Sequence, residues 1–260
     1  TTANMLYMLD HYAPYDKHWA YSVYDTTMTI VVVTDSAGIT TADTSYTYTG
    51  IGGGPDESMK ANFTAAGITY DIWDVWDNGQ ADYQSVLKNY DAVIYAGIYD
   101  WLLWDDMARD HTLGEFVKNG GYLLYSSEEV LGTYTDWEDV TFAPGHFVHD
   151  VLGIEWVGND YNYTAVASNE TNLVTGFSDT MTVQLDSLMF PATGYSMADL
   201  CDPLGWGTPD MLPAPFLGEY APGGLYYNSS VHEVDGGGGT AFLAYNMVQM
   251  PNAKQQLLYT

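Results

Sequence analysis

The chain has 260 residues, of which 47% are hydrophobic and 15% aromatic, so it can bury a sizeable core and is not a disordered acidic tail. Its 6 basic residues stand against 34 acidic ones, which gives a formal net charge of −28. Such a field repels nucleic acid and anionic lipid, and no apolar run approaches the roughly 18 residues of a membrane-spanning helix.

The first elements along the chain are a strand and a β-hairpin. The apolar run at residues 3–10 predicts a core strand that ends at Asp10. A β-branched run at 28–34 and an alternating stretch at 40–49 predict two paired strands. We interpret the region 19–50 as a β-hairpin insertion in a larger α/β domain.

A helix and a βαβαβ unit follow. Pro55 at the first helical position and Gly67 as the terminator predict a helix between them. Over residues 68–127, apolar runs alternate with two helix-period segments. One covers 78–90 and the other ends at Gly120. This alternation is typical of parallel strands joined by helices.

The second half of the chain has weaker patterns. Residues 146–157 predict a short helix that runs into a strand at Ile154, and residues 159–235 predict added strands and long loops. A buried strand is expected after the glycine run 236–239, and a helix begins within 251–260. We predict a single domain over residues 1–260, as a fragment of a larger chain.

Several segments resemble a known family of modules. They read YDIWDVW, DAVIYAGIYDW, LGEFVKNGGYLLYSSEEVLG, HDVLGIEWV and GGGGTAFLAYNM. They are similar to the flavodoxin-like domains, related to the class I glutamine amidotransferase fold, of large secreted bacterial and archaeal surface proteins. The resemblance implies a three-layer α/β fold with a mainly parallel sheet, and a non-catalytic structural or adhesive role.

The sequence departs from the catalytic members of that fold. Amidotransferases carry a Cys nucleophile on a tight strand–helix elbow, whereas here the strand ending at Ser127 continues into two glutamates. The single cysteine, Cys201, has no basic neighbour and is expected to be a buried apolar residue. We therefore predict that the chain is not an enzyme, with a degenerate amidotransferase-like site at Ser126–Glu129 as the alternative.

Acidic residues gather where ligands bind in open α/β sheets, beyond the carboxyl ends of the strands. The residues expected at this edge are Asp10, Asp74, Asp100, Asp105, Glu128 and Glu129. Carboxylate oxygens suit Ca²⁺, so a calcium site is the candidate there. The alternative is an acidic rim that is only solvated, and no other cofactor is predicted.

Two histidines form a weaker metal candidate. His146 and His149 stand three positions apart, and on a helix this spacing would place both imidazoles on one face, as a zinc pair requires. The sequence indicates no third zinc ligand near them. An ordinary polar helix is the alternative.

Four N-x-S/T sequons indicate an exported, glycosylated protein. Their asparagines are Asn62, Asn162, Asn169 and Asn228. With the resemblance, they predict an extracellular structural or adhesive module of a cell-surface layer, sheath or filament, which contacts copies of itself or other surface proteins. The alternative is an accessory binding or spacer domain of a secreted peptidase or other hydrolase.

Overall fold

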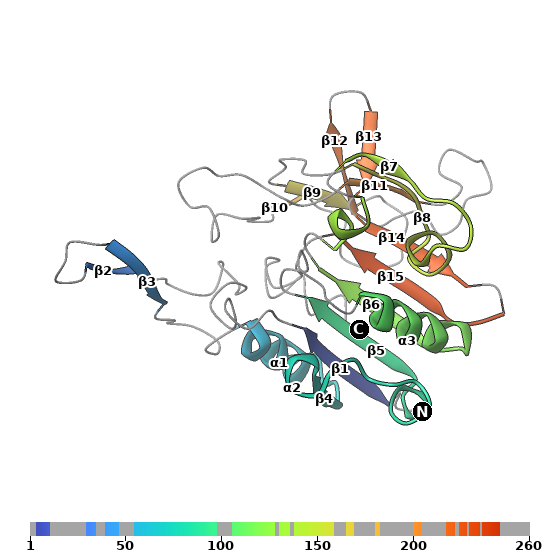
Figure 1. The fold of residues 1–260 in the computed structure, drawn as a ribbon, viewed down its shortest axis with the longest axis horizontal. Helices are drawn as coiled ribbons and strands as arrows, with labels where there is room; N and C mark the ends of the chain where they lie inside the picture. The colour runs from blue at the N-terminus through green and yellow to red at the C-terminus, as the bar shows by residue number, and fades with distance from the viewer. Residues whose placement is uncertain are drawn as a thin grey trace.

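The computed structural model describes only part of the chain, and every structural statement below concerns that part (Figure 1). The described residues are 4–10, 30–34, 40–46, 55–97, 106–127, 130–135, 138–158, 165–168, 180–182, 200–203, 217–221, 224–227, 229–234 and 236–244.

The centre of the fold is a six-stranded sheet. Its spatial order is β14 (Ser229–Glu233), β15 (Gly239–Leu243), β6 (Tyr122–Ser126), β5 (Ala92–Gly97), β1 (Met5–Asp10) and β4 (Tyr70–Asp74). All neighbours pair in parallel except β14, which is antiparallel to β15. Numbered along the chain, the five parallel strands have the order 2-1-3-4-5 of flavodoxin-like sheets. The predicted fold class is confirmed.

Helices cover the two faces of this sheet because its strands alternate apolar residues on both sides. On one face, Phe116 of α3 (Asp106–Lys118) joins Tyr95, Tyr125 and Phe242 in the main core. We call this side the α3 face. On the other, the α1 face, the Tyr7 ring packs on Phe63 of α1 (Pro55–Ala65) with 5.2 Å between ring centroids. Figure 1 shows α3 alongside β5 and β6, and α1 near β1 and β4.

One predicted helix is absent from the described residues, and the reason is local. Between β4 and β5 lie the four-residue helix α2 (Val75–Asn78), turns, and the short 3₁₀ helix η2 (Leu87–Asn89), where the sequence predicted a helix over 78–90. The Asp82 carboxylate accepts hydrogen bonds from both the backbone N–H and the hydroxyl of Ser85, each at 2.9 Å. Such side-chain turns compete with helix formation.

A second sheet lies in the region that the sequence left loose. Its order is β10 (Thr180–Thr182), β9 (Ala165–Ser168), β12 (Leu217–Ala221), β13 (Gly224–Tyr227), β11 (Leu200–Pro203), β8 (Ile154–Gly158) and β7 (Val140–Thr141), all antiparallel. The predicted added strands are confirmed. The sequence did not predict that β7 and β8 belong to this sheet.

The remaining elements agree with the sequence. The hairpin strands β2 (Ile30–Thr34) and β3 (Thr40–Tyr46) pair antiparallel, and the rest of 19–50 lies outside the described residues. The predicted short helix before Ile154 is α4 (Phe147–Asp150), which follows the 3₁₀ helix η3 (Gly132–Tyr134). Cys201 is fully buried, as predicted, and joins a core cluster that includes residues of both sheets.

Candidate functional site

The carboxyl ends of the parallel strands meet at one edge, as predicted. Asp10 pairs in register with Gly97, and Asp74 pairs with Leu9 of the neighbouring strand. The side chains of Asp10 and Asp74 are not described, and Asp100, Asp105, Glu128 and Glu129 lie outside the described residues. Among the side chains that are described, no group of three or more His, Cys, Asp or Glu could hold a metal. The calcium site stays a prediction.

The two serines at the end of β6 are unsuited to nucleophilic attack. Ser126 and Ser127 are both 0% exposed, and the Ser127 backbone N–H donates to the Leu243 carbonyl at 3.2 Å. A nucleophile must reach its substrate. Their burial counts against a degenerate amidotransferase-like site at this strand end.

The two histidines do not both lie within a helix. α4 begins at Phe147, so His146 is the residue before the helix, and its Nδ1 accepts from the Val148 backbone N–H at 3.2 Å. His149 Nδ1 lies 2.8 Å from an oxygen of Asp150. The predicted arrangement for a zinc pair is therefore wrong, because the first imidazole serves as a helix cap.

One predicted glycosylation site is buried. Asn62 lies on α1 and is 1% exposed, next to the core residue Phe63. This burial counts against a glycan on Asn62 in the folded protein, and its glycosylation stays a prediction. Asn162, Asn169 and Asn228 lie outside the described residues, and their glycosylation is likewise a prediction.

Sequence reasoning missed a buried charged network beside α3. Arg109 is 0% exposed, and its Nε–H and Nη2–H both donate to Asp110 Oδ1 at 3.2 Å. The hydroxyl of Tyr134 donates to the same oxygen at 2.6 Å. The guanidinium carbon also lies 5.8 Å from the ring centroid of Tyr125 and 5.7 Å from that of Tyr134, within cation–π range. The network links α3, β6 and η3.

The electrostatics of this network are those of an internal ion pair. Burial raises the pKa of the Asp110 carboxyl, and the nearby Arg109 charge only partly opposes it. Burial lowers the pKa of Arg109, but the surrounding tyrosines and Asp110 more than offset this, and the pKa rises well above its usual value. Arg109 therefore stays charged in the folded protein.

Asp110 also borders a groove between α3 and the α4 region, with a volume of about 430 Å³. A carboxyl with a raised pKa in a groove is a candidate acid or base. Here the same carboxylate oxygen already accepts bonds from Arg109 and Tyr134. These hydrogen bonds therefore favour a structural role for Asp110, which anchors α3, over a catalytic role.

On the groove's other wall, Asp150 supports the turn before α4. Both of its carboxylate oxygens accept from the Gly145 backbone N–H at 3.1 Å. This hydrogen bonding outweighs a smaller desolvation effect, and with help from His149 it lowers the pKa of Asp150.

We expect Asp150→Asn to reduce the free energy of unfolding at pH 7 and to have less effect in acid. The folded pKa lies below the unfolded value of about 3.9, so the carboxylate stabilises the fold above that pH. This stabilisation is lost as the pH falls through the folded pKa. Urea unfolding at pH 7 and pH 3 measures the difference. Exposed Glu138→Gln controls for the loss of one negative charge, and an equal cost of Asp150→Asn at both pH values would contradict the expectation.

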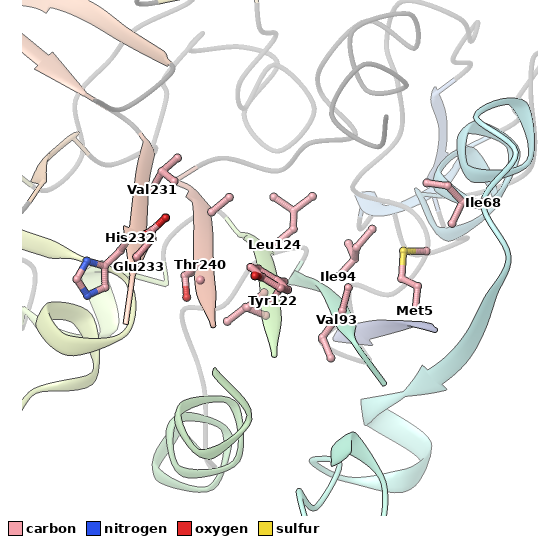
Figure 2. A pocket seen from close by; sticks show the side chains of 14 residues that line it. Met5, Ile68, Val93, Ile94, Tyr122, Leu124, Val231, His232, Glu233 and Thr240 are labelled. Atoms are coloured by element: carbon pink, nitrogen blue, oxygen red, sulfur yellow. The ribbon is translucent and has the colours of Figure 1, made fainter. Parts of the chain in front are cut away.

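A second groove crosses the α1 face of the main sheet and is apolar. It has a volume of about 380 Å³, and its lining includes Met5, Ile94, Leu124, Val231 and Ala241. Figure 2 shows Met5, Ile94, Leu124 and Val231 extending to one side of the sheet, and Val93 and Thr240 to the other. We call this site the sheet groove.

The sheet groove lies toward the amino ends of the strands, away from the acidic edge. Tyr122, the first residue of β6, borders it and is 64% exposed. Large exposed aromatic side chains beside apolar surface commonly take part in protein contacts. No helix in the described ranges is long and apolar enough to cross a bilayer.

Comparisons with known proteins identify the fold. No protein-family model and no curated protein matches the sequence. Among solved structures, cytoplasmic protein STM3548 from Salmonella typhimurium is similar over 98% of this chain and 96% of its own, with a TM-score of 0.51 and 12% identity. Cytoplasmic protein STM1381 from Salmonella typhimurium LT2 has a TM-score of 0.51 at 10% identity, covering 98% and 93%. At such identities the likeness shows a shared α/β fold alone.

Proposed function

We propose that the chain is a non-catalytic, glycosylated extracellular module that assembles in a cell-surface layer, sheath or filament. Its partners would be copies of itself or other surface proteins. The resemblance to domains of large secreted proteins motivates the location, and Asn162, Asn169 and Asn228 are the remaining candidates for N-linked glycans.

The observation that carries this proposal is the sign of the surface charge. Arg109 is the only arginine in the sequence, and it is fully buried in an internal ion pair. The other five basic residues, all lysines, face 34 carboxylates. A surface of this kind disfavours phosphate-bearing substrates and nucleic acid. Copies of such a polyanion can associate where cations bridge or screen their carboxylates.

We expect assembly to depend on calcium. Light scattering of the purified protein should show larger species as Ca²⁺ rises to about 1 mM, the range of weak extracellular calcium sites, and a chelator should reverse the change. NaCl at matched ionic strength separates screening from bridging. A protein that stays monomeric across all salt and Ca²⁺ concentrations would refute the assembly proposal. Intact mass before and after deglycosylation tests the glycans.

A further inference from the structure

The first turn of α4 is held by a histidine side chain. His146 precedes the helix in extended backbone, with a φ of −90° and a ψ of 143°, and its Nδ1 accepts from the Val148 backbone N–H at 3.2 Å. The His146 carbonyl accepts from the Asp150 backbone N–H at 2.8 Å. His146 is therefore the N-cap of α4, a position that Ser, Thr, Asp or Asn usually occupies.

This hydrogen bond requires a neutral imidazole. A ring nitrogen accepts only while it carries no proton, so the single proton of neutral His146 lies on Nε2. In the imidazolium both ring nitrogens are donors, and Nδ1–H would then oppose the N–H of Val148. Histidine is the side chain that ordinarily gains its charge between about pH 5 and pH 8. Protonation of His146 therefore breaks the cap.

The surroundings of His146 can accommodate the released, charged ring. The imidazole is half-buried and borders the groove between α3 and the α4 region, which we call the α3–α4 groove. The carboxyl groups of Asp110 and Asp150 line the same groove. The ring centroid also lies 4.7 Å from that of Phe142, within cation–π range. The titratable and charged groups that surround His146 are Asp110, His111, Glu115 and Lys118 of α3, Tyr134 of η3, and His149 and Asp150 of α4.

We propose that His146 is a pH-sensitive cap, which holds the first turn of α4 at neutral pH and releases it in mild acid. Phe147, Asp150 and Val151 line one wall of the α3–α4 groove, so the release loosens that wall. Asp150 does not share this dependence, because the hydrogen bond from the Gly145 backbone lowers its pKa and keeps it charged in mild acid. Cation-dependent assembly does not require this switch, so the two are tested separately.

Hydrogen exchange of the full-length chain at pH 8 and pH 5, normalised to the intrinsic rate at each pH, tests the switch. In the unsubstituted protein, protection of the Val148 and Val151 amides should fall about fivefold at pH 5, the usual effect of losing one N-cap interaction. In His146→Asn, the amide oxygen caps the helix without titrating, so protection should be the same at both pH values. Asp110 and His149 still titrate in this variant, which isolates His146. His149→Gln is the matched control and should show the same fall as the unsubstituted protein.

Three results would overturn the proposal: equal protection at both pH values in the unsubstituted protein, the same fall in His146→Asn, or no fall in His149→Gln. The last result would assign the pH dependence to His149 and Asp150, whose side chains lie 2.8 Å apart. The nitrogen chemical shifts of the His146 ring at pH 8 give a measurement that needs no variant. They should show a proton on Nε2 and none on Nδ1, and the opposite tautomer would also contradict the proposal.

Discussion

Arg109→Met should lower the free energy of unfolding by about 3–5 kcal/mol, the usual cost of removing one partner of a buried ion pair. The substitution leaves the partly buried Asp110 carboxylate without the donors that lie 3.2 Å away. It also removes the cation that lies 5.8 Å from the ring centroid of Tyr125 and 5.7 Å from that of Tyr134. Denaturant unfolding followed by circular dichroism measures the loss.

The pH dependence of this loss in unfolding free energy distinguishes the electrostatic contribution of Arg109 from its packing contribution. Without Arg109, the pKa of Asp110, already raised by burial, should rise further. A folded pKa above the unfolded value destabilises the fold at high pH, and stability returns as the pH falls through the folded pKa. The cost of Arg109→Met should therefore be smaller at pH 4 than at pH 7.

Lys118→Met, at the exposed end of the same helix, is the matched control for loss of one positive charge. Its effect should stay within about 0.5 kcal/mol. Replacing both members of the pair with apolar residues should recover part of the Arg109→Met loss, because no charge then remains buried. A cost of Arg109→Met no larger than that of Lys118→Met would show that the network does not stabilise the fold.

The five parallel strands of the main sheet could be predicted from sequence because each carries a local signal, whereas β14 lies in the region with weak patterns. The run that ends at Asp10, the β5 run at 92–97 and the strand after the glycine run are short, apolar and bounded by turn residues. Such runs between helix-period segments specify a parallel sheet. The order of the strands has no local signal and comes from their pairing in the structure.

The strand pairing of the second sheet and the charged network around Arg109 have no comparable signal in the local sequence. β8 pairs with β11, and Leu200 lies opposite Gly158, a partner that no local pattern identifies. Arg109 is followed by Asp110 on a helix, a pair that usually indicates exposed surface. Only the packing of Tyr125 and Tyr134 around the guanidinium makes it a buried site.

Gly238→Ala should cost about 3 kcal/mol or more, or prevent folding, although it lies in a glycine run that looks like a flexible linker. A Cβ at this position would lie 1.8 Å from the carbonyl oxygen of Gly121. That atom belongs to the backbone entering β6 and cannot move aside. Gly238 is also fixed by its own N–H, which donates to the Val117 carbonyl at 2.7 Å. Thermal and denaturant unfolding measure the cost.

The neighbouring glycines are internal controls for this prediction. Gly236 has a φ of +70° but open space where a Cβ would lie, so Gly236→Ala should cost only about 1–2 kcal/mol of backbone strain. At Gly237 the Cβ would lie 2.5 Å from the Val117 carbonyl oxygen, and at Gly239 the nearest atom is 3.4 Å away. The costs should therefore rise from Gly239 and Gly236 through Gly237 to Gly238. Equal costs at all four would mean that chain flexibility, and not the close approach of β15 to the end of α3, explains the glycine run.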